Sequence, residues 1–542
     1  MKVEYLESII VKKAFINAAN KLDKNKEVVN SLNVFPVPDG DTGTNMSLTM
    51  QSAIKHIRNN SDNTIESIAS AASSGSLMGA RGNSGVILSQ LLRGFGNGLK
   101  NKEQLNIADI ANAFKLASDT AYKAVMKPIE GTILTVAREV AEKALELVEI
   151  EDDIQLFLEK VIEQGEDVLE RTPDMLDVLK EAGVVDAGGK GLIYILKGAL
   201  EAITGKEVII NDIDFEKEGK KIHKKATEDS EIKFGYCTEF IINNTDYDPN
   251  VFRNKISRHG DSMLVVGSEG IIKVHIHTNN PGKVLQEALK IGELIDIKID
   301  NMRYQHRSNL IEENEDTEKK KSKSKKYSFI AVSMGEGIKS VFTDLNVDHI
   351  ISGGQTMNPS TEDILSAIDK VAGENIIILP NNSNIILAAN QAKELSERNI
   401  EVVPTKTIPQ GISALLAFDE ELDIEDNIEN MKESIAYVMT GQITYAVRDT
   451  SINDKEIKQD DIIGISDGDI KAVGKDINTV ALELLRESIN EDNDIITLFY
   501  GEDIKEEYAN ELAELLEEEF ESLDIEVVFG GQPLYYYLIS VE

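Results

Sequence analysis

The stretch "NVFPVPDGDTGTNM" at residues 33–46 interrupts a chain that is otherwise rich in Leu, Ile, Ala and Glu. Its prolines restrict the backbone, and its glycines allow turns that are closed to other residues. Asp39 and Asp41 flank one glycine, so both carboxylates can turn toward one point. Neighbouring carboxylates repel each other unless a cation lies between them, and Mg²⁺ takes one or two carboxylates together with substrate phosphates. The stretch is therefore either a magnesium site or an ordinary helix-capping turn.

The sequence around this loop follows a helical pattern. From Glu4 to about Ile203, apolar residues recur three and four positions apart. Three more helix starts in this segment are marked by Gly or Pro: "GARGNSGV" (79–86), "KPIEGTILT" (127–135) and "DAGGKG" (186–191). A glycine-rich turn before a helix presents unpaired N–H groups to an anion, although each turn alone is more often a simple cap. Together they predict an all-α domain over residues 1–205 with a site at one end of its helices.

Two further regions follow. Residues 206–312 contain strand and helix patterns in the order βαββαβ, which predicts a small ferredoxin-like α+β domain. Residues 313–326 are a blockwise charged tract that reads as a solvated linker. Over residues 327–542 short apolar strands alternate with helices, which predicts an α/β region with a mostly parallel sheet.

Composition excludes several classes of protein. The formal net charge of −38 opposes nucleic acid and anionic membranes, and no apolar run approaches the ~20 residues that span a bilayer. The N-terminus lacks the apolar core of a signal peptide. A single cysteine excludes a disulfide framework within the chain and fits a reducing compartment. We therefore expect a cytoplasmic protein.

The four motifs "PDGDTGTNM", "GARGNSGV", "KPIEGTILT" and "DAGGKG" resemble those of the ATP-binding L subunit of dihydroxyacetone kinases. That family is an α-helical barrel that binds ADP and Mg²⁺ at one end. With its two following regions, the whole chain resembles the fatty acid kinase A subunit of Gram-positive bacteria, whose C-terminal region is an α/β domain of the DegV type.

The resemblance implies the roles of individual residues. Asp39 and Asp41 would hold Mg²⁺. The residues expected at the nucleotide are Thr42, Thr44 and Asn45 beside the phosphates, Gly82, Asn83 and Ser84 opposite them, and Thr132, Arg171 and Asp186 along the pocket. The dihydroxyacetone kinase pattern has a third aspartate before the pair. The nearest polar residue here is Asn33, which is either a weaker ligand or a turn residue.

The resemblance also implies a reaction. ATP would donate its γ-phosphoryl group to a fatty acid carboxylate, and a fatty-acid-binding carrier protein of the DegV type would present that fatty acid to a homodimeric kinase. We expect no apolar lining in the helical segment beyond its own core, which agrees with delivery by a carrier. The C-terminal region and the middle region are both candidates to dock this carrier, and Tyr535–Tyr537 is either a contact surface or a strand with alternate tyrosines packed inside. The alternatives are a dihydroxyacetone-type kinase of small metabolites and a nucleotide-sensing regulator.

A zinc site is expected in the middle domain. His275 and His277 lie two apart in a predicted strand, so they share one face. The only cysteine, Cys237, lies in a strand that can pair beside them, and Glu239 on the same face is a candidate fourth ligand. Cys and His are zinc ligands, and zinc is a feature of the family that the chain resembles. The alternative is an exposed histidine pair and an ordinary buried thiol.

Overall fold

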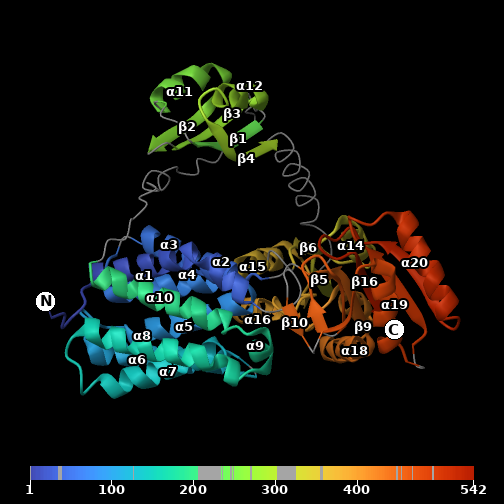
Figure 1. Ribbon diagram of the computed structural model, residues 1–542, viewed down its shortest axis with the longest axis horizontal. Helices are drawn as coiled ribbons and strands as arrows, with labels where there is room; N and C mark the ends of the chain where they lie inside the picture. The colour runs from blue at the N-terminus through green and yellow to red at the C-terminus, as the bar shows by residue number, and fades with distance from the viewer. Residues whose placement is uncertain are drawn as a thin grey trace. The chain divides into compact units, whose positions relative to one another are not determined.

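The computed structural model describes residues 2–542 except 34–39, 61, 126, 206–233, 235, 244–246, 248, 269–270, 302–324, 355–357, 447–449, 453–454, 467 and 491–492. The chain forms two compact units (Figure 1). One unit combines residues 1–211 with 324–542, and the other comprises residues 212–323. The helical N-terminal region and the α/β C-terminal region therefore belong to one unit, although they are far apart in the sequence.

The N-terminal region is helical, as the apolar periodicity predicts. Its helices are α1 (Ser8–Lys24), α2 (Lys26–Leu32), α3 (Thr42–Asn59), α4 (Ile65–Met78), α5 (Gly82–Gly98), α6 (Ile107–Ala124), α7 (Ile133–Leu147), α8 (Ile154–Arg171), α9 (Asp177–Ala182) and α10 (Ala187–Ile203), with the 3₁₀ turn η1 (Thr172–Asp174) before α9. Asn106 and Asp109 form a reciprocal capping box that starts α6. Each longer helix turns an apolar stripe inward, and these stripes form one core.

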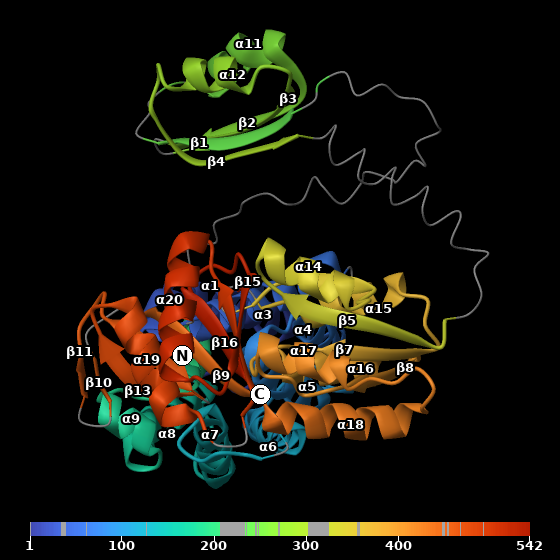
Figure 2. The same cartoon turned by 90° about the vertical axis from the view of Figure 1, so that its right-hand side faces the viewer.

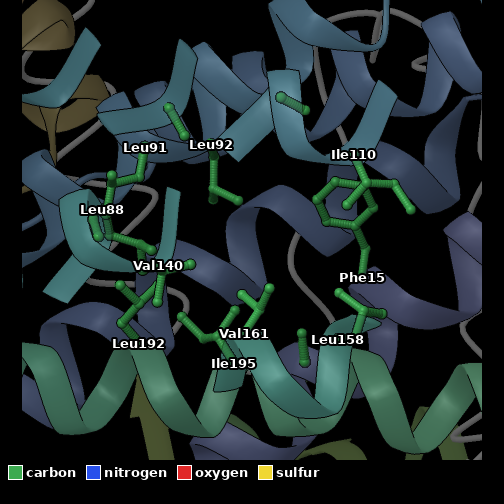
Figure 3. Packing of buried hydrophobic residues seen from close by; sticks show 14 of the residues in the cluster. Phe15, Leu88, Leu91, Leu92, Ile110, Val140, Leu158, Val161, Leu192 and Ile195 are labelled. Atoms are coloured by element: carbon green, nitrogen blue, oxygen red, sulfur yellow. The ribbon is translucent and has the colours of Figure 1, made fainter. Parts of the chain in front are cut away.

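The middle of this helix assembly contains a cavity of about 140 Å³. Only apolar side chains line it, and they come from α1, α3, α5, α6, α7, α8 and α10 and the segments beside them. Phe15, Leu88, Val161 and Ile195 are among the lining side chains that gather in the interior of the bundle (Figure 3). The expectation of no apolar lining beyond the core was therefore wrong. Periodicity reveals which face of a helix is buried but not whether the buried faces fill the space between them.

The second unit has its strands and helices in the predicted order βαββαβ. Its elements are β1 (Tyr236–Asn243), α11 (Pro249–Ile256), the 3₁₀ turn η2 (Ser257–His259), β2 (Gly260–Ser268), β3 (Ile271–Thr278), α12 (Pro281–Ala288) and β4 (Glu293–Asn301). The strands form one antiparallel sheet in the order β2–β3–β1–β4. Phe240, Ile242 and Val274 lie on one face and share a core with Phe252 of α11 and Val284 of α12. Both helices therefore cover the same face of the sheet.

The C-terminal region begins with a parallel sheet in the order β6–β5–β7–β8. The elements of this half are β5 (Tyr327–Ser333), α14 (Glu336–Asp344), β6 (His349–Ser352), α15 (Thr361–Lys370), β7 (Asn375–Leu379), α16 (Ile386–Leu395), β8 (Asn399–Val402), α17 (Ile408–Leu416) and α18 (Ile424–Tyr437). One face packs against α15 and α16, and the other packs against α14, α17 and α18 (Figure 2). This arrangement explains why residues along these strands are apolar almost without alternation.

The second half contains a mixed sheet in the order β13–β12–β9–β16–β14–β15. Its elements are β9 (Met439–Tyr445), β12 (Ile462–Ser466), β13 (Asp469–Gly474), α19 (Ile477–Ser488), β14 (Ile495–Tyr500), α20 (Glu506–Glu519), β15 (Asp524–Phe529) and β16 (Tyr537–Val541), with the separate hairpin strands β10 (Thr450–Ile452) and β11 (Lys455–Ile457). Only β14 and β15 pair in parallel. The prediction of a mostly parallel sheet is thus wrong for this half. The short connection between β12 and β13 permits only antiparallel pairing, and β16 runs antiparallel to both of its neighbours.

The tyrosine run belongs to the core of this second sheet. Tyr537 begins β16, which lies between β9 and β14, and it is 1% exposed. Tyr535 is also buried. The interpretation of Tyr535–Tyr537 as a contact surface is therefore wrong, and the packed alternative is right. Within the described residues, no helix is both long and apolar enough to cross a membrane.

Candidate functional site

Asp41 stands immediately before α3, but its side chain does not cap that helix. The residue occupies the N-cap position without a side-chain capping bond. Its side chain is buried, and Oδ2 accepts a hydrogen bond from Nδ2 of Asn358 at 2.6 Å. The capping interpretation of the loop therefore fails for this carboxylate. The other predicted carboxylate, Asp39, lies outside the described residues.

Asn30 of α2 performs the capping instead. Its Oδ1 accepts from the backbone N–H of Thr44 at 3.1 Å, and its Nδ2 donates to Oγ1 of Thr44 at 3.1 Å. Helix α2 approaches so closely that a Cβ on Gly43 would lie 2.2 Å from the backbone oxygen of Lys26. The glycine in the motif is needed for this contact. Thr44, which was expected beside the phosphates, has its hydroxyl engaged with α2.

The start of α5 lies against the first turn of α3. Gly82 has a φ of +57°, and a Cβ there would lie 2.5 Å from Nδ2 of the buried Asn45. Only glycine suits both the backbone conformation and the close contact. Thr42 begins α3 and Ser84 lies in the first turn of α5. All six residues predicted beside or opposite the phosphates thus lie where α3 and α5 begin.

Two side chains at the start of α5 connect it to the α/β region. Nη1 of Arg81 donates to the backbone oxygen of Asn358 at 2.8 Å and lies 3.4 Å from Oδ2 of Asp363. Nδ2 of Asn83 donates to Oδ1 of Asn384 at 3.1 Å, and its own Oδ1 is buried with no hydrogen-bond partner among the described residues. This helix start is therefore part of the interface between the two regions.

The remaining predicted residues lie at the ends of α7, α8 and α10. Thr132 caps α7 and accepts from the backbone N–H of Leu134 at 3.4 Å. Arg171 ends α8 and pairs with Asp167 at 3.1 Å on the exposed surface. The capping alternative thus describes the side chain of Thr132, and Arg171 makes an exposed ion pair.

Asp186 caps α10 and connects it to the end of α8. Its Oδ2 accepts from the backbone N–H of Gly189 at 2.6 Å, and its own backbone N–H donates to Oγ1 of Thr172 at 3.1 Å. Burial raises the pKa of the Asp186 carboxyl to about 6, although backbone N–H groups of Gly189 and Ile133 favour its charged form.

These residues form two neighbouring groups. The first comprises Asp41 and the starts of α3 and α5. The second comprises the starts of α7 and α10 and the end of α8. Met46, one turn into α3, packs so closely on Gly191, one turn into α10, that a Cβ there would lie 2.7 Å from its sulfur. The starts of α3 and α10 therefore lie side by side. Asn33 lies just after α2, where its backbone N–H donates to the backbone oxygen of Asn30 at 3.1 Å.

The donors around Asp41 fit a hard cation and a phosphate chain. A buried carboxylate supplies the oxygen ligand that Mg²⁺ prefers. Helices α3 and α5 both begin here, and helix N-termini carry N–H groups and partial positive charge that suit anions. Sequence patterns missed Asn30, Arg81 and Asn358, because the importance of each depends on a partner distant in the sequence or on another helix.

The strand register of the second unit brings the predicted zinc ligands together. Cys237 of β1 pairs opposite His277 of β3, and Glu239 pairs opposite His275. All four residues alternate with the buried positions, so they share the sheet face opposite the helices. The side chains of Cys237, Glu239 and His275 lie outside the described residues, and among described side chains no group of three acidic, Cys or His residues could hold a metal.

Three protein-family models match the chain. A DAK2 domain matches residues 36–201, the middle domain of the FakA-like fatty acid kinase family matches 233–309, and the C-terminal domain of that family matches 328–542. Together they cover all three regions of the fold.

Similar proteins span the whole chain. Protein YloV of Bacillus subtilis is 45% identical over 556 residues and covers 100% of both chains. An uncharacterised protein of Staphylococcus aureus strain USA300 is 44% identical, with 97% of each chain covered. Among solved structures, a DegV family protein of Corynebacterium glutamicum (13% identity, TM-score 0.31) covers 40% of this chain and 97% of its own. The dihydroxyacetone kinase of C. freundii in complex with AMP-PNP and Mg²⁺ (16% identity, TM-score 0.29) covers 37% of this chain and 35% of its own.

Proposed function

Because the chain belongs to the FakA-like fatty acid kinase family, we propose that it transfers the γ-phosphoryl group of ATP to the carboxylate of a fatty acid and so forms an acyl phosphate. One observation carries this proposal: the carboxylate of Asp41 is buried where α3 and α5 begin and does not cap the helix that it precedes. The DAK2 match covers Asp41 and the starts of α3 and α5, and it supports a kinase.

In this proposal Asp39 and Asp41 hold Mg²⁺, and Asn33 is either a third ligand or a turn residue. The proposed nucleotide-binding residues all lie at helix ends, and they are Thr42, Thr44, Asn45, Gly82, Asn83, Ser84, Thr132, Arg171 and Asp186. The bound cation would neutralise phosphate charge and orient the phosphate chain. The helix starts supply N–H donors for the phosphate oxygens.

The proposed reaction needs little acid–base chemistry from the protein. A carboxylic acid has a pKa of about 4, so the acceptor is already ionised at neutral pH and no general base is required. The obstacle is the approach of two anions, and catalysis then consists of alignment and charge stabilisation. The paired-carboxylate loop and the uncharged donors at the helix starts suit this task.

We propose that the fatty acid is presented by a separate fatty-acid-binding carrier protein of the DegV type, and that residues 327–542 form the region that docks it. We divide the rest of the chain into a kinase domain (1–205), a middle domain (206–312) and a charged linker (313–326). We also expect a cytoplasmic homodimer, on the family resemblance.

For the middle domain we propose a zinc ion held by Cys237, His275 and His277, with Glu239 as a candidate fourth ligand. The register that places Cys237 opposite His277 supports this proposal. Thiolate and imidazole are the ligands that zinc prefers. The ion would shape the domain and take no part in phosphoryl transfer.

Measurement of ATP consumption and acyl phosphate formation, with and without fatty-acid-loaded carrier, tests the function. We expect acyl phosphate only when the loaded carrier is present. ATP consumption with dihydroxyacetone and without a carrier would favour the small-metabolite kinase. Nucleotide binding without turnover under every condition would favour the regulator.

A further inference from the structure

We propose that Asn358, which lies in the α/β region, is a positioning residue of the phosphoryl-transfer site, since its side chain orients the carboxylate of Asp41 for metal binding. This inference rests on the proposed function. It extends that function, because it assigns part of the active site to a region for which we otherwise propose carrier docking.

The contact between the two side chains is short and secluded. Nδ2 of Asn358 lies 2.6 Å from Oδ2 of Asp41, and the two residues are 1% and 9% exposed. An ionised carboxylate can only accept hydrogen bonds, so the amide must present its NH₂ group to it. A donor to a charged acceptor in a secluded place makes a stronger bond than one in water.

A neutral amide is well suited to orient a carboxylate that binds a metal ion. A lysine or arginine at this position would neutralise the carboxylate and compete with the cation. The neutral amide instead restricts the carboxylate plane and leaves its charge in place. Ligating carboxylates are commonly oriented by such outer hydrogen bonds, and loss of the outer partner typically weakens metal affinity or activity about 10–100-fold.

The surrounding structure holds Asn358 firmly. Its backbone is restricted because Pro359 follows it, and its backbone oxygen accepts from Nη1 of Arg81 at 2.8 Å. Immediately after it, Ser360 and Asp363 form a capping box that starts α15. An amide whose backbone is fixed by Arg81 and by the helix start that follows it can impose its geometry on Asp41.

The backbone that follows Asn358 is also connected to the residues before α5. Arg81 pairs with Ser360 in an isolated antiparallel bridge, and the backbone N–H of Thr361 donates to the backbone oxygen of Ala80 at 3.1 Å. Ala80 and Val86 share a hydrophobic core with α15, α16 and the parallel sheet. The residues just before and at the start of α15 therefore pack against the start of α5, next to the proposed phosphate-binding turn.

The amide oxygen of Asn358 is not used for structure. Oδ1 is buried and has no hydrogen-bond partner among the described residues. The buried amide oxygens of Asn83 and Gln391 in the same interface are likewise without a partner among the described residues. What sets Asn358 apart is therefore its donor, because of these three amides only Asn358 directs its N–H group at the carboxylate of Asp41 in the hydrogen bonds of the described residues.

Substitution of Asn358 by leucine tests the proposal in the full-length protein. Leucine keeps the approximate shape and removes the donor. The matched control is Gln391→Leu, because Nε2 of the buried Gln391 donates to the backbone oxygen of Leu77 at 2.8 Å in the same interface, in a contact that does not involve Asp41. The readouts are the Mg²⁺ concentration that half-saturates ADP binding, measured by calorimetry, and the thermal unfolding temperature.

We expect Asn358→Leu to raise that Mg²⁺ concentration about 10–100-fold and Gln391→Leu to change it less than about twofold. Asn358→Ser, which shortens the side chain without placing an apolar group beside the carboxylate, should also raise it and serves if the leucine variant does not fold. Equal Mg²⁺ dependence in the Asn358 and Gln391 variants would overturn the proposal. Tighter Mg²⁺ binding in Asn358→Leu would overturn it too, since the amide would then be blocking the metal. If the wild-type protein binds ADP without any dependence on Mg²⁺, the proposed function itself fails.

Discussion

Asn358 donates a hydrogen bond to Asp41 at 2.6 Å, across 317 residues of sequence. The bond joins the loop before a helix of the α/β region to the acidic loop before α3. The helical region is thus not a self-contained module with a docking region attached to it. The carboxylate of Asp41 lies in the contact between the two regions, where its hydrogen-bond donor comes from the α/β region.

Asp41→Ala should abolish phosphoryl transfer while the protein still folds. The change removes a charged metal ligand, and we expect turnover to fall at least about 100-fold, as for the loss of a group that stabilises transition-state charge. The free energy of unfolding should fall by about 1–3 kcal/mol, because Nδ2 of Asn358 is left buried without its acceptor. The control Asp119→Ala removes an exposed carboxylate paired with Lys115 and should change neither quantity much. Near wild-type turnover of Asp41→Ala at saturating Mg²⁺ would refute the metal assignment.

The variant Asp186→Asn should gain stability relative to the wild-type protein as pH rises. Burial raises the pKa of Asp186 to about 6, whereas the unfolded chain releases this proton near pH 4. The folded protein therefore binds more protons between these values, and the wild-type free energy of unfolding loses this contribution as pH rises through about 6. Asparagine does not titrate and remains a good N-cap.

Denaturant unfolding at pH 4 and pH 7.5, without nucleotide, measures this effect. Relative to wild type, the variant should gain roughly 1–2 kcal/mol between the two values, which is less than the full equivalent of the shift because the side chain is only partly buried. A stability difference that is the same at both pH values would show that the carboxyl is not perturbed.

The double variant His275→Ala/His277→Ala should lose zinc. Elemental analysis of the wild-type protein should find about one zinc ion per chain, as for a site of three protein ligands. His56→Ala, which removes a histidine from the helical region, should retain the metal. A wild-type protein without zinc, or unchanged zinc in the double variant, would remove the zinc site, and the four residues on that sheet face would then need another explanation.

Ala137→Leu should stabilise the protein. Ala137 lies on α7 and lines the apolar cavity of about 140 Å³, so a larger side chain there has space to occupy. Filling such a cavity commonly adds about 0.5–2 kcal/mol to the free energy of unfolding. Ala144, on the same helix, is fully buried but does not line the cavity, and Ala144→Leu should instead cost about 1–3 kcal/mol through overpacking. If both variants are destabilised alike, the cavity is not available to a side chain of this size.

Local patterns were sufficient for much of the fold. Apolar residues three and four apart predicted the helical region, and the alternation of strands and helices predicted the βαββαβ unit and the first parallel sheet. The same reasoning failed for the second sheet, because strand direction depends on connections and neighbours and not on the composition of the strand itself. The tyrosine run near the C-terminus shows the same limit, since Tyr537 is buried because β16 is an inner strand and its face of the sheet packs against α19 and α20.

The candidate site also combines features that local sequence determines with features that depend on tertiary contacts. The sequence by itself determined the acidic glycine loop, the glycine-marked helix starts and the histidine pair in a strand, because each depends on residues within a few positions of one another. Only the tertiary structure decided that Asp41 does not cap its helix, that Cys237 lies opposite His277, and that Asn358 donates a hydrogen bond to Asp41. Those relationships arise when segments that are distant in the sequence pack together, and a buried carboxylate such as Asp41 then needs a hydrogen-bond donor from the segment packed against it.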